Sequence, residues 1–580
     1  MGIKRAIALL IAFLLCLSFI GCTDAGPEEK VNQEQEPQSE AEQPQQEPKD
    51  EPETLKPVEE EQKPAPKPEE KTYPTPEEVG PHTIPQELVE KESKLPIPTA
   101  EKLPSNWRGF NLNNKQSIDR SWSNKPYQEW QVKAVSDFGF NFLRIAIDYR
   151  TWLINADCNK VNVEFLENEL DQLIGWGLKY DVHIQLDMHI GPGHESQHAA
   201  PKDERVLWKD ESAQEDFARM WAMLARRYKG IPNQKLTFNL LNEPHDISNE
   251  EYVAVMLKAI EAVRKEDPDR LMIVDGNSYT TVPLEALAGI PNVAQAMHMY
   301  EPFNLTHYRA SWVSGSGEWP VPTWPVISIP TTIKGVYHSG APLTINGNFD
   351  ESEVTLRVGT VSGTNDLVVL ADGKEVYRKN FVNTGGEGEW KEVHYVEEWN
   401  VYQNVYDKDY SFTLPGGTKK IEIKSTTDWL TVTDITIAPK DPDKKTIRIT
   451  PNDTNWNSQQ VILNVDKDGI VTIDSASAIK DKQWVKETRL DPWLNFSKEH
   501  NVGFYIGEWG VHQFTPHDVT LRYIEDMIDL FHENGIGWAL WNLNGSFGII
   551  DSGRPDVKYE DYEGHKLDRK MLEILQKYND

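Results

Sequence analysis

Short apolar runs alternate with longer amphipathic stretches from about residue 100 to residue 300. The runs expected to form strands are 107–112, 142–147, 182–189, 236–243, 271–276 and 294–300. Apolar residues recur at helical spacing between them, over 127–139, 163–177, 213–230 and 250–265. Continuous apolar runs that alternate with helical segments indicate parallel strands joined by crossover helices.

Two further strands are expected much later in the chain, at 502–509 and 537–543, each followed by a helical pattern, at 517–534 and near 566–577. Eight strand–helix repeats predict a (β/α)8 TIM barrel. Residues 99–325 would form its first part and residues 477–580 its second. The active site of such a barrel lies at the carboxyl ends of the strands.

The segment 326–476 between the two parts has a different period. Val354, Leu356 and Val358 alternate with polar residues, Asp372-Gly373 offers a hairpin turn, and 421–437 alternates again. This pattern predicts an inserted β-sandwich. In style the segment resembles carbohydrate-binding β-sandwich modules, so it either binds glycan or only shapes the rim of the cleft. Asp366, Asp372 or Asp434 would be candidate calcium ligands, although no ligand spacing supports such a site.

The N-terminus has the pattern of an export signal. Lys4 and Arg5 precede an apolar run that ends at Phe19, and residues 19–22 (FIGC) resemble the lipobox of bacterial lipoproteins. We therefore expect a signal peptide over 1–22, lipidation at Cys22 and a protein anchored to the extracellular face of the bacterial membrane. Free secretion is the alternative. Residues 23–98, rich in Glu, Pro and Gln, are predicted to be a disordered linker.

The net charge argues against some classes of binding partner, and the cysteine content argues against a disulfide framework. The formal net charge of −32 argues against binding to nucleic acid or to anionic membrane surfaces. After processing, Cys158 would be the only cysteine besides Cys22, so no intrachain disulfide is expected. We expect a monomer.

Two glutamates end apolar strands at the predicted barrel mouth. Glu243 closes LTFNLLNE and Glu508 lies in YIGEWG. Facing carboxylates suit glycoside hydrolysis, where one protonates the leaving oxygen and the other attacks the anomeric carbon or stabilises its charge. Pro244 is expected to keep Glu243 extended. The alternative is a structural role for both glutamates in ion pairs.

Other polar and aromatic residues are expected near the same strand ends: Arg144, His189, Asn242, His298, Tyr300 and Trp541. Each of them has an ordinary alternative, because barrel interiors are filled with buried ion pairs, histidines and aromatic side chains.

Taken together and in this order, Arg144, His189, Asn242-Glu243-Pro244, His298-x-Tyr300, Glu508 and Trp541 resemble the pattern of the family 5 glycoside hydrolases, the cellulase family. The resemblance implies a retaining mechanism with Glu243 as acid/base and Glu508 as nucleophile. Arg144 would keep Glu508 ionised, while burial and the neighbouring anion would keep Glu243 protonated. Asn242 would bind the sugar 2-hydroxyl and Tyr300 would orient Glu508. His189 and His298 would bind hydroxyls, and Trp541 would stack on a sugar.

Other chemistry has little support in the sequence. There is no Walker loop, and HESQH at 194–198 lacks the HExxH form of zinc proteases, so neither a metal nor a cofactor is expected. The leading function is an endo-β-1,4-glucanase-like hydrolase acting on polysaccharide. The same chemistry on mannan, xyloglucan or β-1,3-glucan is the first alternative, and a non-catalytic carbohydrate-binding lipoprotein is the second.

Overall fold

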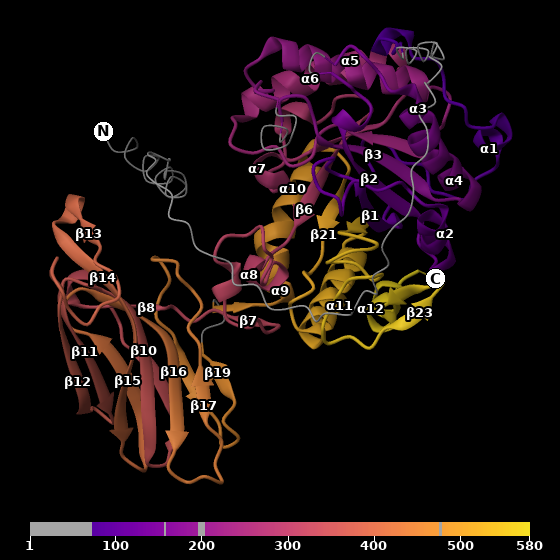
Figure 1. Ribbon diagram of the computed structural model, residues 1–580. Coiled ribbons are helices and arrows are strands. Elements are labelled where there is room, and N and C mark those ends of the chain that lie inside the picture. Colours follow the sequence, from indigo (N-terminus) through magenta and orange to yellow (C-terminus); the bar gives the residue numbers. More distant parts are fainter. Residues whose placement is uncertain (1–71, 156–157, 195–202, 475–477, 580) are drawn as a thin grey trace, which may run out of the picture. The chain divides into compact units, whose positions relative to one another are not determined.

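The computed structural model describes residues 72–155, 158–194, 203–474 and 478–579. Eight strands close into a barrel in the order β1-β2-β3-β4-β5-β6-β21-β22, and every neighbouring pair is parallel (Figure 1). The strands are β1 Arg108–Lys115, β2 Phe142–Asp148, β3 His183–Ile190, β4 Leu236–Asn239, β5 Met272–Asp275, β6 Val293–Met299, β21 Phe504–Trp509 and β22 Trp538–Leu540. The predicted (β/α)8 barrel is confirmed.

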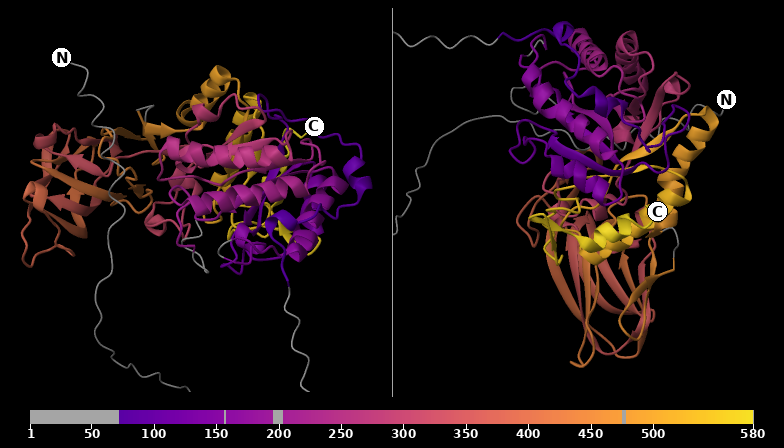
Figure 2. Two further views of the ribbon diagram at one scale, coloured as in Figure 1. Left: turned by 90° about the horizontal axis from the view of Figure 1, so that it is seen from above. Right: turned by 90° about the vertical axis from the view of Figure 1, so that its right-hand side faces the viewer.

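Helices cover the outside of the barrel (Figures 1 and 2). The principal ones are α2 Glu129–Asp137, α4 Gln172–Tyr180, α5 Glu211–Arg227, α6 Asn249–Glu266, α10 Asp491–His500, α11 His517–Glu533 and α12 Arg569–Leu575. After β5 the crossover holds only α7 Asn277–Thr280 and a short 3-10 turn, Glu285–Leu287. The helix α6 begins with a capping box, in which Ser248 accepts from Glu251 N and Glu251 accepts from Ser248 N.

The end of the barrel opposite the strand carboxyl ends is filled by an apolar cluster around Trp107. Its indole is fully buried and packs 4.8 Å from the ring of Phe142 and 4.6 Å from that of His183, measured between centroids. Ala100 and Leu103 belong to the same cluster. The chain that leads into β1 therefore closes this end of the barrel.

Residues 72–98 lie against the barrel, whereas the sequence predicted a linker up to residue 98. The segment contains α1 Gln86–Glu90, and its apolar residues Val79, Ile84 and Val89 join the barrel's hydrophobic core. The side chain of Arg227 donates to the carbonyls of Gly80 and Pro81, at 3.0 and 3.2 Å. Isolated apolar residues in a Pro- and Glu-rich context do not stand out in sequence, which explains the wrong boundary.

The inserted segment forms two sheets with its own hydrophobic core. One sheet has the order β13-β14-β10-β16-β17, with β8 also paired to β16, and the other has the order β12-β11-β15-β9-β18-β19. The bounds are β8 Thr332–Lys334, β9 Leu343–Phe349, β10 Ser352–Ser362, β11 Thr364–Ala371, β12 Lys374–Val382, β13 Tyr395–Val396, β14 Val401–Leu414, β15 Thr418–Ser425, β16 Trp429–Pro439, β17 Ile447–Ile449, β18 Ile462–Val465 and β19 Val471–Ile473. In the described residues of the insert, only 3-10 turns accompany these strands (Figure 2).

The insert leaves and re-enters the barrel chain through a short two-stranded stem. Strand β7, Val326–Ile327, pairs antiparallel with β20, Ile479–Lys480. The insert therefore lies in the connection between β6 and α10, which is a βα connection of the barrel.

The three aspartates considered for calcium are all bonded to protein donors. Asp366 accepts from Arg378 and Asn380, Asp372 accepts from the backbone of Lys419 and Lys420, and Asp434 accepts from Arg448. These contacts tie neighbouring strands and turns together.

No helix among the described residues combines the length and apolar composition needed to cross a membrane. The expected signal peptide, Cys22 and most of the expected linker lie outside the described residues.

The attachment of the N-terminal segment yields a test of stability. Arg227 and Asp171 form an ion pair of 2.6 Å with side chains at most 2% exposed, and Asp171 also accepts from Thr83 N at 2.8 Å. Asp171→Ala should lower the free energy of unfolding by about 3–5 kcal/mol, because it leaves a guanidinium buried without its counter-ion. Urea unfolding followed by tryptophan fluorescence measures the change.

Glu261→Ala is the matched control, since its ion pair with Lys265 is solvent-exposed. It should leave the unfolding midpoint unchanged. Equal small effects of the two substitutions would contradict the anchoring role of Asp171.

Candidate active site

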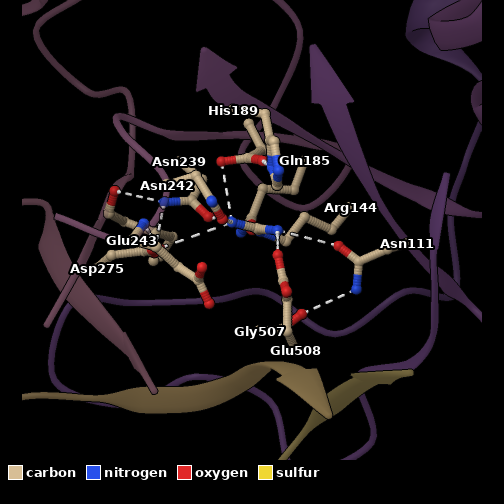
Figure 3. A network of polar contacts seen from close by, with 12 residues as sticks. Asn111, Arg144, Gln185, His189, Asn239, Asn242, Glu243, Asp275, Gly507 and Glu508 are labelled. Atoms are coloured by element: carbon tan, nitrogen blue, oxygen red, sulfur yellow. Dashed lines mark hydrogen bonds and ion pairs between the residues drawn. The ribbon is translucent and has the colours of Figure 1, made fainter. Parts of the chain in front are cut away.

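The guanidinium of Arg144, in β2, occupies the centre of the barrel mouth (Figure 3). It is fully buried and donates to Asn111 Oδ1 at 3.1 Å, Asn239 Oδ1 at 2.8 Å and Asn242 Oδ1 at 2.8 Å. Its Nη1 also donates to Glu508 Oε1 at 2.6 Å. Asn111, Asn239 and Glu508 lie in strands other than β2, and Asn242 follows β4, so one side chain fixes the relative positions of several strand ends.

Two aspartates complete the surroundings of Arg144. Asp187 of β3 lies 3.0 Å away and Asp275 of β5 lies 3.7 Å away, and both carboxylates are fully buried. Burial alone lowers the pKa of Arg144, but Asp187, Glu508 and Asp275 outweigh it and raise that pKa above its ordinary value. A buried cation is tolerated here because it is fully paired.

Four members of this network were missed by the sequence analysis: Asn111, Asp187, Asn239 and Asp275. Each is a polar residue inside an otherwise apolar, buried strand, in GFNL, QLDM, TFNL and IVDG. A buried polar side chain needs a partner, and that signal was available for all four.

Glu508 of β21 is held at both carboxylate oxygens. Arg144 occupies Oε1, and the hydroxyl of Tyr300 donates to Oε2 at 3.0 Å. The side chain is 6% exposed. Tyr300 therefore makes the contact with Glu508 that the resemblance implied, and Glu508 is held in one orientation.

Glu243 lies four residues beyond the end of β4 and has a left-handed backbone, with φ 45°. The expectation that Pro244 would keep it extended is wrong. Asp275 holds this turn, because its Oδ2 accepts from Glu243 N at 3.1 Å and from Thr280 Oγ1 at 3.1 Å. Such backbone strain persists where surrounding contacts impose it, and here it directs the Glu243 side chain towards Glu508.

His298, at the end of β6, lies between the two glutamates. Its Nδ1 is 2.8 Å from Glu243 Oε1 and 3.8 Å from Glu508 Oε2. Its contacts are with carboxylates, and its expected role in binding sugar hydroxyls stays a prediction. Ligand atoms of Glu243, His298 and Glu508 all lie within 4.8 Å of one another.

The pKa values of the two glutamates shift in the opposite sense from that expected. Burial raises the pKa of Glu508 and Glu243 adds to this, with only partial opposition from His298 and Arg144. Burial also raises the pKa of Glu243, but the hydrogen bond and charge of His298 outweigh it and lower that pKa below its ordinary value. The sequence argument lacked the contact between Glu243 and His298.

Of the remaining candidates, His189 and Trp541 line the same mouth and Asn242 is buried beside it. His189 stacks on Trp541 with centroids 5.5 Å apart, and its Nδ1 lies 3.2 Å from Asp187 Oδ2. Trp541 follows β22 directly. Because Oδ1 of Asn242 accepts from Arg144, any hydrogen bond from Asn242 to a substrate must come from Nδ2. Their roles in binding stay predictions.

By distance alone, Glu243, His298 and Glu508 form a group able to hold a metal ion. The environment fits a cation poorly, because the Arg144 guanidinium already lies 2.6 Å from Glu508. In the HESQH stretch, His194 Nε2 lies 3.0 Å from the carbonyl oxygen of Asn242, and residues 195–198 lie outside the described residues.

A cleft of about 1240 Å³ surrounds the two glutamates. Large aromatic side chains that the sequence analysis did not assign line it while staying 41–55% exposed: Trp122, Tyr279, Phe303, Trp312 and Phe514. Trp122 follows β1 and Tyr279 follows β5, and these strands stand opposite each other in the eight-stranded barrel. Aromatic surface is therefore present on opposite sides of the glutamate pair.

Residues 98–335 match the sequence profile described as Cellulase (glycosyl hydrolase family 5). This match covers the first part of the barrel and supports the family that the strand-end residues suggested. The profile ends inside the insert, so Glu508 lies beyond the matched residues.

Curated relatives agree with this assignment. The chain is 30% identical over 190 residues to Endoglucanase C of Acetivibrio thermocellus, covering 32% of this chain and 53% of that protein. It is 25% identical over 320 residues to Endoglucanase 3 of Fibrobacter succinogenes, covering 49% of this chain and 46% of that protein. The chain thus spans about half the length of the curated relatives it matches.

A solved structure described as that of a glycoside hydrolase shares the fold. It superposes with a TM-score of 0.51 at 22% identity, and the match covers 81% of this chain and 99% of the other.

The central cation leads to a pH-dependent stability test. Arg144→Met leaves Asp187, Asp275 and Glu508 buried together without their cation, which should strongly destabilise the protein at neutral pH. Burial already raises the pKa of Glu508, and losing Arg144 should raise it further. A carboxyl group whose pKa is higher in the folded state than in the unfolded state makes the protein less stable as the pH rises. The deficit in melting temperature relative to wild type should therefore shrink from about pH 8 to about pH 5.

Arg270→Met is the control for this test. Arg270 is equally buried but donates mainly to the carbonyls of Leu236, Tyr228 and Ile231, with Asp267 as its only carboxylate. Its deficit should vary less with pH. An Arg144→Met deficit of the same size at both ends of the range would contradict the charge argument.

Proposed function

We propose that this protein is a retaining glycoside hydrolase that cleaves β-linked glucan polysaccharide within the chain, in the manner of an endo-β-1,4-glucanase. The observation that carries the proposal is the pair Glu243 and Glu508, whose facing carboxylate oxygens lie within 4.8 Å. Retaining enzymes have carboxyl groups about 5–5.5 Å apart, whereas inverting enzymes need about 6.5–9.5 Å to admit a water.

In the first step, Glu508 attacks the anomeric carbon while Glu243 donates a proton to the glycosidic oxygen, so the C–O bond breaks and a glycosyl ester forms on Glu508. In the second step, Glu243 takes a proton from water, which attacks the same carbon and releases Glu508 as a carboxylate. Arg144 and Tyr300 support the assignment of Glu508 as nucleophile, because together they fix both of its oxygens.

The exposure of the Glu243 side chain supports its assignment as the acid/base. Its side chain is 30% exposed to the cleft, so both a sugar oxygen and a later water can reach it. In this mechanism Asn242 Nδ2 would donate to the sugar hydroxyl next to the reacting carbon, a contact that strengthens in the transition state.

The aromatic residues on opposite sides of the cleft support cleavage within a chain. Sugar rings present apolar C–H faces that pack on aromatic side chains. Trp122 beside β1 and Tyr279 beside β5 would each hold sugars, one on either side of the cut. An exo-acting enzyme would need only one of the two sides to be open.

Two other functions remain as alternatives. The same chemistry on mannan, xyloglucan or β-1,3-glucan would leave the glutamate pair unchanged, because loops around the mouth select the glycan. A non-catalytic binding lipoprotein would have no need for a close pair of glutamates held by Arg144 and His298, so the geometry favours an enzyme.

We also propose that the protein is held at the outer face of the cell membrane by lipid on Cys22. The support is the sequence FIGC after an apolar run. Mass spectrometry of the N-terminal peptide from native cells tests this proposal, with Cys22→Ala as control. A lipidated cysteine at the new N-terminus is expected, and an unmodified secreted chain would contradict it.

The first experiment on function is a digest of β-1,4-glucan, mixed-linkage glucan, xyloglucan, mannan and β-1,3-glucan, followed by sizing of the products. A ladder of oligomers from a β-1,4-glucan is expected. Glu508→Gln should retain less than about a hundredth of that activity, because loss of the nucleophile abolishes the covalent step.

Glu243→Gln provides the comparison. It should lose most activity on polysaccharide, yet form the covalent intermediate readily from an aryl cellobioside whose leaving group needs no protonation. No release from any glycan would reject the proposed function, and a Glu508→Gln variant above that limit would reject the assignment of the nucleophile.

A further inference from the structure

His298 has contacts that a hydroxyl-binding residue does not need. The side chain is 1% exposed, and its Nδ1 lies 2.8 Å from Glu243 Oε1. Its Nε2 is buried, has no hydrogen-bond partner among the described residues, and lies 3.6 Å from Asp275 Oδ2. Both ring nitrogens therefore face carboxylates.

The surroundings hold His298 in this position without offering another partner. A Cβ on Gly507 of β21 would lie 3.0 Å from Nε2, a tight contact, so the glycine leaves room for the ring beside this strand. Asp275 accepts hydrogen bonds from Asn239, Glu243 N and Thr280, which fix its carboxylate beside Nε2.

A neutral imidazole fits this environment badly. It would turn one nitrogen lone pair towards a carboxylate, either Glu243 or Asp275, with no proton between them. An imidazolium presents an N–H to each carboxylate. Burial lowers the pKa of His298, but Glu508, Asp275 and Glu243 outweigh it and raise that pKa.

We propose that His298 is a buried imidazolium that directs the acid proton of Glu243 to its cleft-facing oxygen and converts Glu243 into a base for the second step. The inference rests on the proposed hydrolase function and deepens it. The side chain of His298 is 1% exposed and acts through its contact with Glu243, so we treat it as a positioning residue.

The first part follows from hydrogen-bond geometry. Since Nδ1–H already occupies Oε1 of Glu243, a proton on Glu243 must sit on Oε2. That is the oxygen left for the glycosidic bond. The proton then moves from Oε2 to the leaving oxygen, and His298 keeps both of its protons throughout.

The second part follows from the change in charge at Glu508. In the free enzyme, each of the two neighbouring carboxyl groups disfavours ionisation of the other, while the His298 cation lowers the pKa of Glu243. When Glu508 is esterified its charge is gone, and the His298 cation, 2.8 Å away, then favours the Glu243 anion. That anion is the form that accepts a proton from water.

The other charged groups near the cluster are Arg144, Asp275, His189 and Glu508. Arg144 keeps its charge at both steps, and so does the buried Asp275 beside it. His189 acts on Glu243 only through space, because its Nδ1 is bonded to Asp187. Of these four groups, Glu508 is the one whose charge is removed and restored within each catalytic cycle.

Nitrogen NMR of the whole protein with 15N-labelled histidine tests the protonation state directly. The signals of His298 are assigned by their loss in His298→Asn. Both ring nitrogens should remain protonated from about pH 5 to about pH 8, well above the ordinary histidine pKa near 6.5. A neutral tautomer at pH 7 would overturn the proposal, whether or not the protein is a hydrolase.

Kinetics of His298→Asn test the role in the reaction. Asparagine can place a donor near the position of Nδ1 but carries no charge, so it separates the hydrogen bond from the cation. The alkaline limb of kcat/KM reports Glu243 in the free enzyme, and it should move up by about one to two pH units when the cation is lost.

The acidic limb of kcat for an activated aryl cellobioside should move the same way, because breakdown of the glycosyl ester is then limiting and Glu243 must be ionised. At fixed neutral pH, kcat should fall about ten- to a hundredfold. His298→Ala should show the same shifts with a further loss of kcat, since it also removes the donor.

His183→Asn is the matched control for burying an asparagine in place of a histidine. His183 is fully buried, and its ring nitrogens contact Gln234 O and Thr237 Oγ1, with no carboxylate. It should lower the melting temperature and leave both pH limbs in place. Unmoved limbs in His298→Asn, in a protein that still hydrolyses glycosides, would overturn this inference and leave the proposed function standing.

Discussion

A single buried guanidinium imposes the arrangement of the barrel mouth. Arg144 cannot be placed in an apolar barrel unless its charge and its donors are matched, and the matching groups come from β1, β3, β4, β5 and β21. This demand explains why amides and carboxylates interrupt strands that are otherwise apolar. It also joins residues far apart in the chain, since Arg144 and Glu508 are separated by 364 positions.

The network turns the strand ends into one electrostatic unit. Asp275 illustrates this, because the same carboxylate lies near Arg144, holds the backbone of Glu243 and faces His298. The position of Glu243 thus depends on a residue that never meets the substrate. Catalytic geometry of this kind relies on supporting contacts as much as on the reacting groups.

Much of this could be predicted from sequence, and the failures have physical reasons. Strand and helix periods located the barrel, and strand-end carboxylates located Glu243 and Glu508. The polar positions Asn111 and Asp187 were visible within apolar strands, but their common partner was not, because sequence alone does not show which strand positions share a level of the barrel. The reversed order of the two pKa values arose from His298, whose contact with Glu243 depends on a left-handed turn that a proline was expected to prevent.

The N-terminal boundary failed for a different reason. Composition describes an average, and over residues 72–98 the average is polar, although Val79, Ile84 and Val89 are buried one at a time. Each is fixed by the surface it meets, such as α4, which α1 contacts, and not by a period of its own. Only the folded partner reveals such a segment as part of the domain.

The short stem formed by β7 and β20 has a consequence for how the chain folds. The last two strands can join the barrel only after the chain has passed through the long insert. The entropic cost of closing a loop grows with the number of residues in it. Pairing Val326–Ile327 with Ile479–Lys480 brings the two ends of the insert together. Once they are paired, most residues of the insert no longer count in the loop that must close between β6 and β21. Shortening the effective loop about fourfold saves about 1.2 kcal/mol of closure entropy. An inserted domain that ties its own ends in this way lets a barrel fold nearly as if the insertion were absent.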